Sequence, residues 1–147
     1  MPAEAPLVAE PAGRYARKPP VVVDCSVLAA VLFDEPKREG AALAMAGKEL
    51  FAPDLLDHEI VSVALKKSAA GHPDIAEHAL VDLDAIQLTR CRVEADAQFR
   101  LAERTGLTAY DAAYLQLALE LRAPLVTFDR LLGRIARDIL ADVRQRP

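Results

Sequence analysis

This chain of 147 residues has few cysteines and no long apolar run. Its two cysteines, Cys25 and Cys91, form no metal-binding motif, and free, reduced thiols in a cytoplasmic protein are the simplest interpretation. The longest apolar stretch, residues 21–33, is interrupted by Asp24 and is too short to span a bilayer, so we expect no membrane segment. The N-terminus has no basic region followed by an apolar one and does not resemble a signal peptide.

Positive charge is also scarce. The formal net charge of −4 argues against a broad, sequence-independent grip on nucleic-acid phosphates, although it leaves a local site open. Every cation after Lys67 is an arginine, which suits phosphate contacts, but codon bias in a GC-rich genome explains this composition better. The length and the composition indicate one globular domain. We expect a flexible, proline-rich leader at residues 1–20 and a single domain at residues 21–147.

Short apolar strands alternate with helical patterns along the domain. The three valines at residues 21–23 predict a strand buried on both faces, followed by a helix at residues 26–33. Further strands are predicted at residues 49–52, 86–89 and 125–127, and further helices at residues 37–46, 55–70, 73–85, 95–103, 107–121 and 131–136. The tail is weakly patterned, and a strand at residues 140–143 stays open. This alternation predicts an α/β fold of three layers, α/β/α, with a central, mostly parallel sheet of four or five strands.

Four acids are predicted to meet at one edge of that sheet. Asp24 and Asp129 directly follow strands, while Glu59 and Asp111 lie near the starts of helices. Each acid also has a local explanation. Asp24 and Asp129 are candidate helix caps, as is Ser26. Thr108 is a predicted helix cap with which Asp111 resembles a capping box, and Glu59 resembles a solvated flank.

A cluster of carboxylates has a chemical consequence that single acids lack. Several carboxylates cannot stay ionised side by side without a cation, unless some of them hold protons. Ligands that are all oxygen favour Mg²⁺ or Mn²⁺. The histidines His58, His72 and His78 lack zinc-type spacing relative to these acids, and we expect them at the surface or rim.

Other α/β classes fit the sequence poorly. A haloacid-dehalogenase-like phosphatase needs a second aspartate two residues after the first, where this chain has Ser26. A receiver domain usually has clustered acids after its first strand and a lysine after its last, and Arg130 is a poor substitute. A dinucleotide-binding domain is unsupported because no glycine-rich turn follows the first strand.

The segments VVVDCSVLAAVL, APDLLDHEIVSVALKK, LTAYDAAYLQLAL and LVTFDRLL resemble the four acidic motifs of the PIN domain. The likeness is greatest to the VapC-type toxin ribonucleases of toxin–antitoxin pairs, and it runs from about residue 21 to about residue 137. The resemblance implies an endoribonuclease dependent on Mg²⁺ or Mn²⁺. In it, Asp24 and Asp111 would be metal ligands, while Glu59 and Asp129 would hold water molecules or a second ion.

Three further residues match weaker positions of the family pattern. Ser26 would orient a ligand water, or only cap a helix, and Thr127 supplies a hydroxyl before the fourth acid, or only packs. Arg130 would contact a phosphate, although an exposed arginine at a helix start is the simpler interpretation. The resemblance also implies a homodimer and silencing by a VapB-type antitoxin that inserts residues near the acidic pocket. The alternative is a catalytically silent PIN-like module that binds RNA or protein, against which the retention of all four acids counts.

Overall fold

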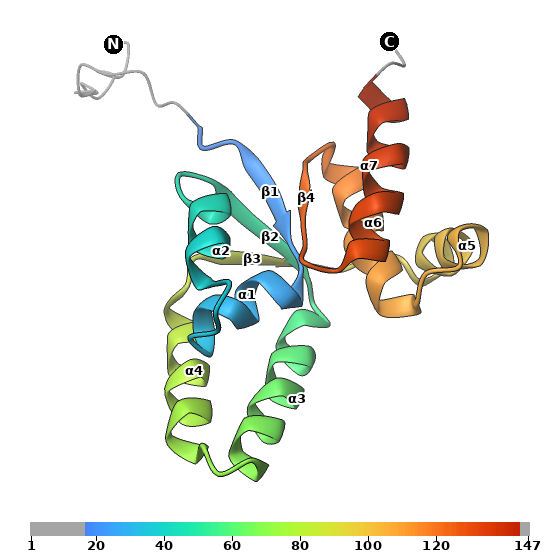
Figure 1. Cartoon of the computed structure of the whole chain (residues 1–147). Coiled ribbons are helices and arrows are strands. Elements are labelled where there is room, and N and C mark those ends of the chain that lie inside the picture. The colour runs from blue at the N-terminus through green and yellow to red at the C-terminus, as the bar shows by residue number, and fades with distance from the viewer. Residues whose placement is uncertain (1–16, 145–147) are drawn as a thin grey trace, which may run out of the picture.

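A parallel sheet of four strands forms the centre of the computed structural model, which describes residues 17–144 (Figure 1). The strands are β1 (Pro20–Val23), β2 (Glu49–Pro53), β3 (Leu88–Cys91) and β4 (Leu125–Val126), in the order β3-β2-β1-β4. Val21, Val22 and Val23 are at most 2% exposed, because β1 is paired on both edges and covered on both faces. The predicted α/β class and central parallel sheet are confirmed.

Seven helices surround the sheet within the described residues. They are α1 (Cys25–Leu32), α2 (Arg38–Met45), α3 (Leu56–Ala69), α4 (Pro73–Ala85), α5 (Ala95–Thr105), α6 (Ala109–Leu121) and α7 (Arg130–Arg144). In Figure 1 α3 and α4 form a hairpin that extends away from the sheet, and α5 lies beyond α6. No helix between residues 17 and 144 is both long and apolar enough to cross a membrane.

The two faces of the sheet are covered by different helices. Side chains alternate between the faces of a strand, so Val22 and Val23 point in opposite directions. Val22 packs in a core cluster with Leu117 of α6. Val126, which is paired with Val23, packs against Val27 in a second cluster built from α1 and α2. This arrangement gives the predicted three layers.

The structure corrects several predicted boundaries. Pro20, expected in the leader, is the first residue of β1, and residues 1–16 of that leader lie outside the described part of the chain. β3 begins at Leu88 rather than at residue 86, because Ile86 ends α4 by donating its N–H to Asp82. The open strand at residues 140–143 is part of α7, whose residues Leu132, Ala136, Ile139 and Leu140 recur at helical spacing and pack with α5 and α6.

Candidate active site

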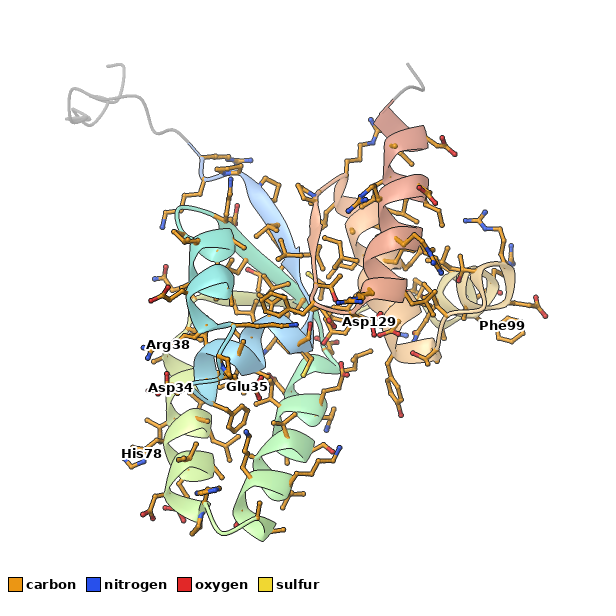
Figure 2. The ribbon with its side chains drawn as sticks, viewed as in Figure 1. Asp34, Glu35, Arg38, His78, Phe99 and Asp129 are labelled. Carbon is orange, nitrogen blue, oxygen red and sulfur yellow. The ribbon has the colours of Figure 1, made fainter. Side chains whose placement is uncertain are left out.

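A pocket of about 530 Å³ at the carboxyl end of the sheet brings the four predicted acids together. Asp24 comes from the β1–α1 junction and Asp129 from the β4–α7 junction, while Glu59 and Asp111 lie in the first turns of α3 and α6. Figure 2 shows Asp129 near the centre of the molecule, where α7 begins. The four acids are spread over more than a hundred positions of the sequence, yet they converge on one recess, as parallel strands with crossover helices allow.

Asp24 is the buried carboxylate of this site. Its side chain is 5% exposed, and its Oδ2 accepts hydrogen bonds from Ser26 Oγ (2.7 Å) and Thr127 Oγ1 (2.8 Å). These bonds lower the cost of burying the charge. Asp24 precedes α1 but makes no side-chain capping bond, so the capping explanation for it is wrong. Because both bonds end on Oδ2, the other carboxylate oxygen is available to a ligand in the pocket.

The two hydroxyls extend this network to the β4–α7 junction. Ser26 Oγ accepts the N–H of Phe128 (3.0 Å), and Thr127 Oγ1 accepts the N–H of Asp129 (2.9 Å). Asp129 in turn caps α7, since its Oδ1 accepts the N–H of Leu132 (2.8 Å). The sequence left capping of α7 and membership of the pocket as alternatives for Asp129, and the structure shows both. Ser26 and Thr127 fix the first and fourth acids relative to each other.

Glu59 has a partner that the sequence did not reveal. The hydroxyl of Tyr114, a fully buried residue of α6, donates to Glu59 Oε1 (2.7 Å). Burial is the largest influence on Glu59 and raises its pKa, the charges of Asp24 and Asp111 raise it further, and the Tyr114 bond lowers it. The only signal in the sequence was that Tyr114 follows Asp111 by three residues, which places both on one face of the helix.

Asp111 is affected by the same cluster. Burial raises its pKa most, followed by the negative charges of Asp24 and Asp129, while a hydrogen bond with Thr108 lowers it. Thr108 is the predicted cap of α6, and its Oγ1 accepts the N–H of Asp111 (3.1 Å). The acids are therefore close enough to oppose one another's ionisation, as expected of a cluster that a cation would stabilise.

The donor set fits a hard divalent cation with a partly hydrated shell. Among residues 17–144 no three His, Cys, Asp or Glu side chains are grouped so as to hold an ion by themselves. Mg²⁺ usually binds proteins through one or two carboxylates and keeps several water ligands, so it needs no closed protein cage. A buried carboxylate with one oxygen available, beside acids with raised pKa values, matches that requirement. All three histidines are exposed, as predicted.

Other residues of the pocket have different roles. Cys25 also lines it, but burial, reinforced by the charge of Glu59, raises the pKa of its thiol to about 12. Because the thiolate is the reactive form, Cys25 is unsuited to act as a nucleophile near neutral pH. Glu35 and Lys37 line the pocket from the α1–α2 connection, and Phe128 lines it from the β4–α7 junction. Arg130 is exposed and does not belong to the lining, so the site gives no support to its predicted phosphate contact.

Comparison with known proteins assigns the fold to a family. The family model described as PIN domain matches residues 21–138, a range that contains all four acids. The chain belongs to the PIN-domain family. It is 35% identical over 121 residues to Ribonuclease VapC3 of Pyrobaculum aerophilum, covering 77% of this chain and 92% of that protein. The predicted resemblance to PIN proteins of the VapC type is confirmed.

A solved structure supports the same assignment. The crystal structure of PAE2754 from Pyrobaculum aerophilum matches this PIN domain with a TM-score of 0.63 and 25% sequence identity. The match covers 88% of this chain and 92% of the other. The chain therefore shares its α/β architecture with this solved structure.

Proposed function

We propose that this PIN-domain protein is a divalent-metal-dependent endoribonuclease, the toxin of a VapBC-type toxin–antitoxin pair. Its membership of the family and its similarity to Ribonuclease VapC3 support ribonuclease activity. The observation that carries the proposal is the pocket itself, in which Asp24, Glu59, Asp111 and Asp129 meet and in which acids raise one another's pKa. A protein that only bound RNA would gain nothing from such a repulsive surface.

In this proposal Asp24 and Asp111 hold a Mg²⁺ or Mn²⁺ ion. When bound, the ion supplies positive charge that polarises the scissile phosphate and offsets its negative charge during in-line displacement. Ser26 and Thr127 keep Asp24 oriented through their hydrogen bonds to its Oδ2. Tyr114 keeps Glu59 oriented and, by donating a hydrogen bond, favours its ionised form.

Glu59 and Asp129 would orient water in the pocket or hold a second ion. Either carboxylate can accept a hydrogen bond from the attacking water molecule, which must lose a proton as it adds to phosphorus. Because water rather than the ribose 2′-hydroxyl attacks, the products should carry a 5′-phosphate and a 3′-hydroxyl. A 2′,3′-cyclic phosphate among the products would contradict this choice of nucleophile.

The partners follow from the same assignment. We infer an RNA substrate, a VapB-type antitoxin that inserts residues near the acidic pocket, a homodimer, and a cytoplasmic location. A partner that covers the pocket would explain how an active ribonuclease is tolerated by a cell. Co-expression with the neighbouring small reading frame, followed by co-purification and a cleavage assay, tests the antitoxin directly.

The test of the activity itself is metal-dependent cleavage of structured RNA by purified protein. We expect cleavage with Mg²⁺ or Mn²⁺, its loss with a chelator, and its loss in Asp24→Ala and in Asp111→Ala. Asp82→Ala, which changes an exposed acid of α4, is the matched control and should cleave at the parent rate. Cleavage that survives both pocket substitutions would contradict the proposal, and RNA binding by the parent without cleavage would favour a silent binding module.

A further inference from the structure

The pocket is lined by one basic side chain, that of Lys37, which lies among acids. Five acids line the recess, namely Asp24, Glu35, Glu59, Asp111 and Asp129, whereas Lys37 is the single lysine or arginine in the lining. An RNA strand brings a negative charge for every nucleotide, so its approach to this surface is opposed by the acids. A cation beside the acids is the group that can offset this repulsion on the side of the pocket formed by the α1–α2 connection.

Lys37 is held by an aromatic ring rather than by an acid. It immediately precedes α2, and its Nζ lies 4.9 Å from the centroid of the Phe128 ring. This distance is typical of a cation–π interaction, which orients the ammonium group without using up its three N–H donors. Phe128 is itself anchored, because it packs against the buried cluster of Val27, Ala30 and Ala41.

The two acids that precede Lys37 in the α1–α2 connection have other partners. Asp34 is paired with Arg38 (2.8 Å), and Glu35 lies 3.7 Å from the ammonium group of Lys67. Figure 2 shows Asp34, Glu35 and Arg38 together at the connection between α1 and α2. Within residues 17–144 Lys37 itself makes no ion pair at 4.0 Å or less. Its charge is therefore available to a ligand.

A chain of contacts ties this lysine to the buried acid. The N–H of Phe128 donates to Ser26 Oγ, which in turn donates to Asp24 Oδ2. The backbone of Phe128 is thus fixed relative to Asp24, while the packing of its ring against α1 and α2 sets the place of the Lys37 ammonium group. A charge at a fixed place beside the acids selects where along the pocket a phosphate can rest.

We propose that Lys37 binds a backbone phosphate of the RNA strand beside the bond that is cut, and that Phe128 is the positioning residue that holds Lys37 there. This inference rests on the proposed ribonuclease function. A lysine suits the role because an ammonium group acts as a point charge toward phosphate oxygens. The contact carries no base preference, so it contributes to affinity for RNA of any sequence.

Steady-state cleavage kinetics of a single-stranded RNA at several KCl concentrations test the proposal. Lys37→Ala should raise KM about five- to tenfold with little change in kcat. The slope of log(kcat/KM) against log[KCl] should become shallower by about 0.7, the value for one lost contact to a single-stranded phosphate. Lys37→Arg should recover most of the affinity. Lys66→Ala, which removes an exposed lysine of α3 outside the pocket, is the matched control and should behave as the parent.

Two variants of Phe128 separate positioning from simple packing. Phe128→Tyr keeps the aromatic ring and should keep the parent KM, whereas Phe128→Leu keeps the apolar contact but should raise KM about as much as Lys37→Ala. In the double variant Lys37→Ala/Phe128→Leu the effect on KM should be no larger than in Lys37→Ala alone, because both act through one contact.

Three outcomes overturn the inference. The first is an unchanged KM and salt slope in Lys37→Ala, and the second is a fall in kcat alone. The third is an equal change in Lys66→Ala. Failure of the ribonuclease proposal is distinguishable from these, because it appears as absent cleavage by the parent. In that case the affinity of each variant for the same RNA, measured by fluorescence anisotropy, tests whether Lys37 contacts the RNA. Weaker binding by Lys37→Ala than by Lys66→Ala supports the contact, and equal binding, or none by the parent, contradicts it.

Discussion

Replacing Tyr114 with phenylalanine isolates the contact between Tyr114 and Glu59. The substitution removes the hydroxyl that donates to Glu59 Oε1 at 2.7 Å and keeps the ring in its fully buried position. A hydrogen bond to an ionised group contributes about 1.5–3 kcal/mol. Glu59 is only partly buried, so water replaces some of the lost interaction, and we expect a loss in the free energy of unfolding of about 1.5 kcal/mol. For a chain of this size that corresponds to a fall in Tm of about 3–6 °C.

The loss should depend on pH in a defined direction. Burial raises the pKa of Glu59 in the folded protein above its unfolded value, so the folded state holds that proton more tightly. Stability therefore falls as pH rises from the unfolded pKa through the folded one. The Tyr114 bond limits this rise in the pKa of Glu59, and its removal lets the pKa rise further. The stability difference between parent and Tyr114→Phe should thus be larger at about pH 8 than at about pH 4.

Chemical denaturation of metal-free protein at both pH values measures this difference. Tyr110→Phe is the matched control, since Tyr110 lies on the same helix but is 62% exposed, and it should change stability by less than about 0.5 kcal/mol. A loss in Tyr114→Phe that is equal at both pH values, or larger at the acid one, would refute the link between this hydroxyl and an ionised Glu59.

Further predictions concern the other groups of the pocket. Asp111→Asn removes a charge that Asp24 opposes, so the metal-free variant should be more stable than the parent by about 1 kcal/mol near neutral pH, with the gap closing in acid. Mn²⁺ should raise the Tm of the parent but not of that variant, and equal stabilisation of both would show that the acids do not share an ion. Thr127→Val removes a hydrogen bond from a buried carboxylate and should cost about 1–3 kcal/mol in chemical denaturation, so an unchanged midpoint would contradict the bond. Cys25, with a thiol pKa of about 12, should react with iodoacetamide more slowly than Cys91 in the native protein, and faster labelling of Cys25 by peptide mapping would contradict its burial.

Patterns local to the sequence were enough to predict the four acids that line the pocket. The buried valines of β1 placed Asp24 at the carboxyl end of a central strand, and Asp129 followed from the same rule at β4. Thr108 was identified as a helix cap by its chemistry alone. These predictions succeed because each depends on neighbours within a few residues.

Contacts between distant segments were not predictable in this way. Tyr114 is 55 positions from Glu59, and Lys37 is 91 positions from Phe128, so only the folded structure shows that they meet. The C-terminal helix was underestimated for a related reason. Its apolar residues are helical because they pack against α5 and α6, and the weakly patterned tail did not show this packing in advance.

The most direct test is the position of a bound Mn²⁺ ion, measured by anomalous diffraction from crystals of the full chain soaked in Mn²⁺. We expect a single strong peak, or a pair of peaks, in the acidic pocket. A carboxylate oxygen of Asp24 should lie at a bonding distance of about 2.0–2.6 Å, and Asp111 should bind directly or through one water molecule. An ion that binds elsewhere and touches neither Asp24 nor Asp111 would contradict the shared metal site.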